Sequence, residues 1–274
     1  MRKALQYIKV VVLVAPVVIY YHLVYMLRFS HHPEKYPLEK RYKVARKEIR
    51  YVLNRFHVNY NLCNFEMLSS MREKSLIISN HLSFMDPLLL IANSEKPVTF
   101  IAKKETFKMP FVKRVAKAIE VFPLDRENLM SQLSEIKKVV TYLKDPNKPS
   151  VIVYIEGTRN KTPEKGCLDF HAGTLKIAQM AGCPLLVMAT YGSFRILDKH
   201  SYVKPYPTSI SFMEKIEYQD IKSAVTTDLA VSLKEKVDTE IDSLRVYDKS
   251  CVDKSKLSKK RKELENRVNI RINS

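Results

Sequence analysis

Several residue types are scarce in this chain, and their scarcity restricts the kinds of fold and of binding site that the chain can form. The 274 residues contain four cysteines, five glycines and no tryptophan. The cysteines are far apart and form no Cys-x-x-Cys pair, which excludes a cysteine-based zinc pattern and indicates free thiols in a reducing compartment. No internal repeat or low-complexity block is present, which excludes a repeat architecture.

Acidic residues are also in the minority. The chain has 47 Lys and Arg against 29 Asp and Glu, a formal net charge of +18. A protein of this charge is expected to meet a polyanion, which leaves three classes of partner: nucleic acid, an anionic membrane surface, or phosphorylated substrates.

Charged residues are absent from residues 10–27, a run of 18 positions at the lower limit for a membrane-spanning helix. Pro16 and His22 interrupt its apolar character, and tyrosines crowd its far end, as interfacial aromatics do. The run is compatible with a spanning anchor or with a monotopic or re-entrant insertion. A cleaved signal peptide is less favoured, because no small-x-small cleavage site follows. Basic residues flank both ends, so the positive-inside rule gives no orientation.

Two basic stretches lie outside the central part of the chain. Residues 38–56 carry apolar residues at spacings of three or four with Lys and Arg between them, which predicts an amphipathic helix. Such a helix lies on anionic lipid or packs on the domain with its basic face in solvent. Residues 249–274 contain nine Lys or Arg against three Asp or Glu, with a weak helical pattern. We expect a solvated or membrane-surface tail, because no stacking aromatics accompany the charge as nucleic-acid binding would require.

The chain is organised around residues 75–87. The short apolar run at residues 76–78 is typical of a buried strand, and Asp86-Pro87 predicts a helix start with Asp86 as the N-cap. His81 then lies in the loop between strand and helix, where an open α/β sheet places its chemistry. A neutral imidazole can take a proton from a hydroxyl when a carboxylate holds its other nitrogen. An ordinary loop histidine beside a capping aspartate fits the same pattern.

A second strand signal, at residues 151–155, leads directly into Glu156-Gly157-Thr158-Arg159. A strand that ends in Gly-Thr-Arg offers backbone N–H groups and one guanidinium at the sheet edge. That combination suits a phosphate, which arginine binds in bidentate fashion. A turn glycine followed by a surface arginine is the alternative.

Together these stretches resemble the lysophosphatidic acid acyltransferase family of glycerolipid acyltransferases. The family's Asn-His-x4-Asp matches Asn80-His81 and Asp86, and its Glu-Gly-Thr-Arg matches Glu156 to Arg159. Two further blocks also match in order, and the resemblance covers roughly residues 75 to 190. They are Ala102-Lys103-Lys104-Glu105 with Met109-Pro110-Phe111 and Pro123-Leu124-Asp125-Arg126, and Phe170-His171-Ala172-Gly173 with Ala181-Gly182-Cys183-Pro184-Leu185. The chain departs from the pattern at Ile155, Lys113 and Val187, where the family usually has Pro, Gly and Pro.

The resemblance implies a reaction and a set of roles. The chain would move a fatty acyl group from a thioester to the sn-2 hydroxyl of lysophosphatidic acid, giving phosphatidic acid. His81 would be the general base and Asp86 its orienting carboxylate. Arg159 would hold the substrate phosphate, helped by Lys103, Lys104 or Arg126, while Glu156, Gly157 and Thr158 shape that pocket. No metal or cofactor is implied, and acyl-coenzyme A or an acyl carrier protein thioester would be the co-substrate.

The expected fold is α/β, a mixed sheet flanked by helices, with an N-terminal membrane-binding helical segment, because strand and helix signals alternate through the central part. We also expect a helix over 106–118 that is broken at Pro110, a strand at 209–213 and a helix over 220–244. We divide the chain into a membrane anchor at 1–30, a basic surface helix at 31–60, a catalytic domain at 61–247 and a basic tail at 248–274. The expected location is the cell membrane, with the catalytic domain on the cytoplasmic face and membrane lipids as partners. Acylation of another acceptor, such as glycerol-3-phosphate or another lysophospholipid, stays open. A non-catalytic membrane-surface or nucleic-acid-binding protein is the alternative from another class.

Overall fold

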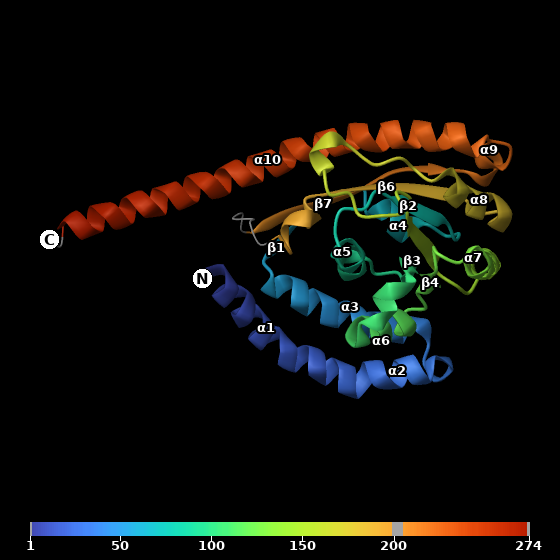
Figure 1. The fold of residues 1–274 in the computed structure, drawn as a ribbon, viewed down its shortest axis with the longest axis horizontal. Helices are drawn as coiled ribbons and strands as arrows, with labels where there is room; N and C mark the ends of the chain where they lie inside the picture. The colour runs from blue at the N-terminus through green and yellow to red at the C-terminus, as the bar shows by residue number, and fades with distance from the viewer. Residues whose placement is uncertain (1, 199–204, 273–274) are drawn as a thin grey trace.

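A single seven-stranded sheet forms the centre of the protein (Figure 1). The computed structural model describes residues 2–198 and 205–272. The strands lie in the order β1-β7-β6-β2-β5-β3-β4, and every neighbouring pair is parallel except β6 with β7. Their bounds are β1 Val58–Cys63, β2 Leu76–Ser79, β3 Val98–Lys103, β4 Phe122–Leu124, β5 Ser150–Tyr154, β6 Leu185–Tyr191 and β7 Tyr206–Ile216.

β2 lies near the middle of the sheet, between β6 and β5. All four of its residues are buried, as expected for a short apolar strand covered on both faces. Ser79 pairs with Tyr154 on one side and with Met188 on the other. The loops that follow β2, β5, β3 and β4 therefore emerge at one edge of the sheet, because these strands are parallel.

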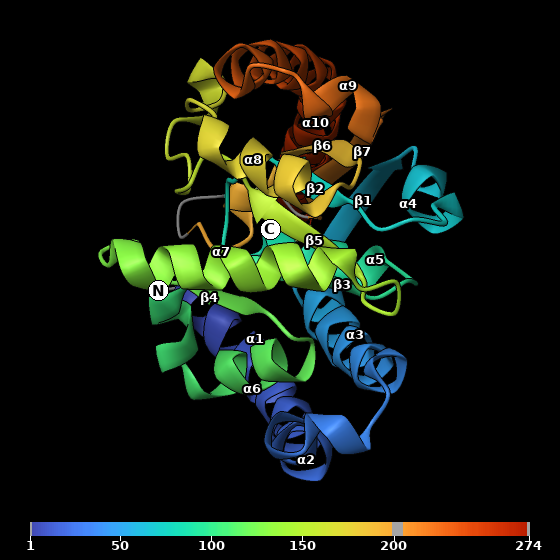
Figure 2. The ribbon, with the colours of Figure 1, turned by 90° about the vertical axis from the view of Figure 1, so that its right-hand side faces the viewer.

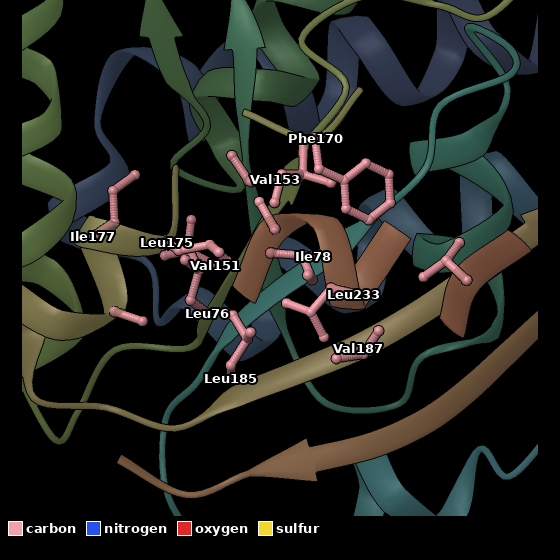
Figure 3. Close-up of a cluster of buried hydrophobic side chains, with 14 of the residues drawn as sticks. Leu76, Ile78, Val151, Val153, Phe170, Leu175, Ile177, Leu185, Val187 and Leu233 are labelled. Atoms are coloured by element: carbon pink, nitrogen blue, oxygen red, sulfur yellow. The ribbon is translucent and has the colours of Figure 1, made fainter. Parts of the chain in front are cut away.

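Helices cover both faces of this sheet, and side chains alternate between the two layers. Leu76 and Ile78 of β2 point into one core, where α8 and α10 pack, and Ile77 points into the other. Figure 3 shows the first core, in which Leu233 of α10 lies against strand residues such as Val187. The second core is built by α3, α5 and the N-terminal helices. The predicted fold class, a mixed α/β sheet flanked by helices, is confirmed.

The helices match the predicted ones closely in the first two thirds of the chain. The expected amphipathic helix is α3, and the break expected at Pro110 separates a 3₁₀ turn, η3, from α6. The bounds are α1 Arg2–Tyr21, α2 Leu27–His31, α3 Leu38–Arg55, α4 Glu66–Ser70, α5 Asp86–Asn93, η3 Lys104–Lys108, α6 Pro110–Ala118, α7 Leu129–Lys144, α8 Ala172–Ala181, α9 Tyr218–Lys222 and α10 Thr226–Ile272.

The N-terminal arm is a nearly continuous helix in which a π-helical turn, η1 (His22–Met26), joins α1 to α2. Within the described residues one stretch, Val12–His31, is long and apolar enough to cross a membrane, by length and composition only. Its second half also packs on the domain: His22 is buried, and its Nε2 lies 3.1 Å from the Phe111 carbonyl oxygen of α6. The arm is therefore tied to α6 by a polar contact as well as by apolar packing.

The C-terminal helix differs from the expected one. A single helix over 220–244 is the prediction, but the chain forms α9, breaks at Ser223, and then forms α10, which runs on to Ile272. The boundary drawn between residues 247 and 248 falls inside α10. Figure 1 shows the end of α10 projecting beyond the sheet. The expected strand at 209–213 is the middle of β7, and residues 199–204 lie outside the described part.

Candidate active site

His81 and Asp86 meet in the loop that leaves the carboxyl end of β2. Nδ1 of His81 lies 2.7 Å from Oδ2 of Asp86, although five residues separate them in sequence. The same oxygen accepts the backbone N–H groups of Leu82 at 2.7 Å and Ser83 at 2.8 Å. The loop thus curls around the carboxylate, and because a carboxylate only accepts hydrogen bonds, the proton of the pair sits on Nδ1.

Asp86 does not cap helix α5 as expected. The helix begins at Asp86 itself, with Met85 at the N-cap and no side-chain capping bond. Its carboxylate points back to the loop, where three N–H donors meet one oxygen. The prediction of Asp86 as N-cap is wrong because its carboxylate accepts hydrogen bonds from N–H groups of the preceding loop, and not from N–H groups in the first turn of the helix. Pro87 occupies the first turn, as predicted.

Glu156, at the start of the loop after β5, supports the backbone of His81. Its Oε1 accepts the His81 N–H at 2.7 Å, and its Oε2 accepts the Leu168 N–H at 3.0 Å. Burial raises the pKa of this carboxyl to about 7, and the two backbone hydrogen bonds oppose that shift. Glu156 is therefore a positioning residue for the histidine loop, held between the loops that follow β2 and β5.

Two asparagines complete the support of this loop. Asn80 bridges to β6, donating from Nδ2 to the Thr190 carbonyl at 2.9 Å and accepting the Thr190 N–H at 2.8 Å. The backbone N–H of Asn160 donates to the His81 carbonyl at 2.7 Å. Both asparagine side chains are buried, so the loop after β2 is fixed from β6 on one side and from the β5 loop on the other.

Tyr154, the last residue of β5, stacks on the imidazole of His81. The ring centroids are 4.2 Å apart and the ring planes differ by 17°. The tyrosine hydroxyl is buried and has no hydrogen-bond partner among the described residues. Burial raises the pKa of Tyr154 well above its usual value, with the charge of Asp86 acting in the same direction. The Tyr154 ring therefore limits the rotation of the His81 imidazole by packing on one face, while Asp86 holds the imidazole at Nδ1.

Gly157 makes the turn between Glu156 and Arg159 possible. Its φ is +69°, in the left-handed region that glycine enters without strain. A Cβ placed there would lie 2.6 Å from Nε2 of His171, so a larger residue would collide with that ring as well. Thr158 and Arg159 follow and are exposed. Within the described residues the Arg159 guanidinium makes neither a hydrogen bond nor an ion pair, and it is free to bind an anion.

The other predicted phosphate ligands lie further along the same edge. Lys103 ends β3, and Arg126 follows β4, so both emerge one or two strands beyond Arg159. Lys104 pairs with Asp125 at 3.0 Å, and Lys103 lies 3.5 Å from Glu105. All three cations are exposed. The structure thus joins His81, Asp86 and Glu156 by direct contacts and places the lysines and Arg126 beside them without joining them to the pair.

Comparison with known proteins identifies the domain. Residues 58–190 match the family described as Acyltransferase, a span that includes β1 to β6 and both loops of the site. This region belongs to the acyltransferase family. The acyltransferase domain is 30% identical, over 166 residues, to the "Probable 1-acyl-sn-glycerol-3-phosphate acyltransferase" of Mycoplasma pneumoniae, covering 59% of this chain and 60% of that protein.

Other relatives of the acyltransferase domain carry the same description. The 1-acyl-sn-glycerol-3-phosphate acyltransferase of Helicobacter pylori is 32% identical over 123 residues, which cover 45% of this chain and 51% of that protein. The chain therefore spans about half to two thirds of the length of these curated relatives. In fold, it resembles the crystal structure of the 1-acyl-sn-glycerophosphate (LPA) acyltransferase of Thermotoga maritima, with a TM-score of 0.62 at 19% identity, covering 88% of this chain and 98% of that one.

Residues that the sequence pattern missed support the acyltransferase site from outside its motifs. Tyr154 and Asn160 flank the Glu156–Arg159 block, and Thr190 lies on another strand. The sequence offers one indication for Tyr154, which is its position at the end of a strand, directly before the loop that contains Glu156 to Arg159. Thr190 had none, because its contact to Asn80 depends on the order of strands in the sheet.

Proposed function

We propose that the chain transfers a fatty acyl group from an acyl thioester to the sn-2 hydroxyl of 1-acyl-sn-glycerol-3-phosphate, giving phosphatidic acid. The observation that carries this proposal is the His81–Asp86 pair at 2.7 Å, one strand away from an arginine that has no partner among the described residues. His81 can serve as a base for a hydroxyl, and Arg159 can serve as a cation for a phosphate. A substrate that carries both groups would bind across the two loops. The names of the curated relatives support the same acceptor.

The chemistry follows from the state of the imidazole. With Nδ1–H donating to Asp86, the lone pair on Nε2 accepts the proton of the acceptor hydroxyl. The resulting oxygen nucleophile attacks the thioester carbonyl, the carbon–sulfur bond breaks, and the thiolate takes the proton from Nε2. Asp86 stabilises the imidazolium between the two proton transfers. A direct transfer of this kind needs no acyl-enzyme and no cofactor, and the proposal involves no metal ion.

The phosphate would be held on the β5 side of the base. Adjacent strands are about 4.8 Å apart, so the loop bearing Arg159 begins one strand from the His81 loop. The sn-2 hydroxyl and the phosphate of the acceptor are separated by only a few bonds, which matches neighbouring loops. Lys103, Lys104 and Arg126 would add positive potential along the next two strands, as exposed charges that attract the phosphate without a fixed geometry.

The membrane features fit a lipid acceptor. The apolar stretch Val12–His31 and the net charge of +18 favour an anionic bilayer as the place of work, where the substrate arrives laterally. We place the catalytic domain on the cytoplasmic face of the cell membrane, with membrane lipids and the acyl donor as partners and with no nucleic acid. The same basic surface would attract an acidic acyl carrier protein as donor. Rates with carrier-protein thioesters that do not change with salt would argue against that attraction.

The deciding experiment is conversion of lysophosphatidic acid to phosphatidic acid by the purified full chain in liposomes, with a coenzyme A or a carrier-protein thioester. Native protein and His81→Ala are compared, with release of the free thiol and formation of the product lipid measured in the same sample. We expect both signals from the native protein, and neither above background from the variant.

Parallel reactions with glycerol-3-phosphate and with lysophosphatidylcholine test the acceptor. Transfer to either of these, with none to lysophosphatidic acid, would keep the reaction and overturn the proposed acceptor. A native protein that acylates none of the three from either donor, while it binds duplex DNA at physiological salt, would overturn the enzymatic proposal.

A further inference from the structure

The first two turns of α7 carry large apolar side chains that are mostly exposed. Leu129, Met130 and Leu133 have exposed fractions of 67%, 76% and 45%. Further along the same helix, Val139 and Leu143 are buried in the core. Leu129 and Leu133 continue the apolar stripe past that core, since they lie within about 80° of Leu143 around the helix, and Met130 adds an exposed side chain beside it. Neighbouring exposed apolar side chains of this kind mark an interaction surface. We call Leu129, Met130 and Leu133 the α7 tip.

The α7 tip lies at the catalytic edge of the sheet. Helix α7 starts only a few residues after β4, and the carboxyl end of β4 is at the same edge as that of β2, which leads to His81. The start of the helix is fixed, because Oδ1 of Asn128 accepts the Ser131 N–H at 3.0 Å. The tip is thus presented by a capped, ordered helix beside the site.

Two further groups of exposed apolar side chains reach this side of the molecule. Met109 and Phe111, at the start of α6, are exposed and follow β3 at the same edge. The Phe111 carbonyl contacts His22 of the N-terminal arm, whose Ile19 and Leu23 are also exposed. Figure 2 shows α7 crossing the middle of the view, with α6 and the arm below it. Exposed apolar side chains therefore occur on all three of these elements.

The charges between these groups indicate what covers them. Arg126, Lys103 and Lys104 are exposed between the α7 tip and α6, and Lys108 and Lys113 flank the start of α6. Two acidic residues in this region, Glu105 and Asp125, are paired with lysines, while a third, Glu127, is exposed just before the α7 tip. Apolar side chains bordered by cations match an anionic leaflet, in which the apolar groups enter the lipid and the cations meet the headgroups.

We propose that the α7 tip is a second membrane contact, separate from the N-terminal arm, which inserts into an anionic leaflet and holds the catalytic edge of the sheet against the bilayer. The arm packs on α3 and α6, so it brings that part of the domain to the bilayer. A second contact at the α7 tip, which follows β4, would attach the sheet edge that carries His81 and Arg159. The proposal concerns binding only and stands whether or not the proposed acceptor is correct.

A fluorescent probe tests this insertion directly in the full chain. In a Cys63→Ser, Cys251→Ser background, which leaves only the two buried thiols, an environment-sensitive dye is attached at Met130→Cys and, as the control, at Val231→Cys of α10. Val231 is exposed by 60%, and its helix packs on the face of the sheet opposite to the one that the N-terminal arm covers. With vesicles of phosphatidylglycerol and phosphatidylcholine that contain spin-labelled lipid, we expect quenching at position 130 and none at 231.

The outcomes separate the possible occupants of the tip. Protein that sediments with the vesicles while the dye at 130 is unquenched would overturn the proposal. A dye at 130 that changes its emission with protein concentration, in the absence of vesicles, would also overturn it and would indicate contact between two copies of the chain.

Paired serine variants give a second measurement without a label. We expect Leu129→Ser with Met130→Ser to weaken partitioning into anionic vesicles about tenfold, since two large apolar side chains lose their transfer from water. Val231→Ser with Val246→Ser, at exposed fractions of 60% and 73%, is the matched control and should leave binding unchanged. Equal binding by both pairs would overturn the proposal. Unchanged circular dichroism and melting midpoints exclude misfolding as the cause.

Discussion

The His81–Asp86 pair and four exposed cations, which we call the cationic row, lie at the same edge of one sheet but are built in opposite ways. Asp86 is buried, and one of its oxygens accepts three N–H groups, while His81 is held by Asp86, Tyr154 and the backbone bond to Glu156. Arg159, Lys103, Lys104 and Arg126 are exposed, and Arg159 has no polar partner among the described residues.

On the proposed function, the difference corresponds to two tasks. A proton would be moved along a fixed line, which favours a base that is oriented before the substrate arrives. A phosphate can be met by flexible cations, because charge attraction depends weakly on geometry. On the proposed function, changes to the buried pair should act mainly on kcat, and changes to the exposed cations mainly on KM.

The largest effect is expected at the pair itself. We expect His81→Ala to lower kcat by about 1,000-fold or more, since a positioned general base contributes about 100- to 10,000-fold. Asp86→Asn keeps an oxygen for the three N–H donors but removes the charge that stabilises the imidazolium, so a loss of about 100- to 10,000-fold is expected. Steady-state rates with saturating lysophosphatidic acid measure both losses.

Each loss at the pair should appear in kcat with KM nearly unchanged. A matched control is His57→Ala, a histidine outside the site, whose backbone carbonyl contacts Tyr206. If His81→Ala retained more than a tenth of the native kcat, the assignment of His81 as the base would fail, and the comparison between the two regions with it.

The second effect concerns Glu156, and it is a matter of stability. Burial raises the pKa of this carboxyl from about 4.5 to about 7. Between these values the folded chain keeps a proton that the unfolded chain has lost, so the free energy of unfolding falls as pH rises from about 4.5 to about 7, by about 3 kcal/mol, and is flat above. Glu156→Gln removes this ionisation and should flatten the curve in that window.

Chemical denaturation at pH 5, 6, 7 and 8 measures this curve in the native chain and in Glu156→Gln. The amide also places a donor against one of two backbone N–H groups, which lowers stability at every pH by about 1–3 kcal/mol. Glu164→Gln, at an exposed position, is the control. An equal slope in all three proteins would contradict the role given to burial.

The third effect is at Arg159, in the cationic row. We expect Arg159→Gln to raise KM for lysophosphatidic acid about 10- to 100-fold while kcat changes little, because a charge-assisted bond to the phosphate is lost and about 1.5–3 kcal/mol goes with it. Arg72→Gln, an exposed arginine before the amino end of β2, is the control at the opposite edge. A fall in kcat with KM unchanged would contradict the role of Arg159 in substrate binding and would indicate a role in the chemical step.

The sequence predicted the elements of both regions better than their connections. The strand at 76–79, the loop with His81 and Asp86, and the amphipathic helix after residue 37 follow from local periodicity and turn residues, and the structure contains them. The placement of Glu156 against the His81 backbone did not follow, because it depends on β5 lying next to β2 in a sheet whose order differs from the order along the chain.

The errors have physical reasons of the same kind. Asp86 was expected to cap its helix, but the three donors of the preceding loop compete for that carboxylate and bind it. The break after α9 was missed since Ser223-Ala224-Val225 contains neither glycine nor proline, and nearby carbonyls instead accept from Gln179. In both cases a contact with a neighbouring segment, which local sequence signals do not contain, decided the boundary of the helix.

The smallest effect tests whether the stack of Tyr154 belongs to the catalytic pair. The ring lies face to face with His81 at 4.2 Å and limits how the imidazole can turn. Tyr154→Leu removes the stack and should lower kcat about 3- to 10-fold, an effect of about 0.5–1.5 kcal/mol.

Tyr154→Phe separates the ring from its hydroxyl. The phenylalanine keeps the stack and deletes a buried hydroxyl that has no partner among the described residues, so kcat should stay within about twofold of native. Steady-state rates of the native chain and both variants make the measurement. If Phe were as impaired as Leu, the hydroxyl would be the active part of Tyr154, and the pair would extend to a third polar group. If Leu matched the native chain, the stack would be packing alone, and the fixed orientation of His81 would rest on Asp86 and the loop.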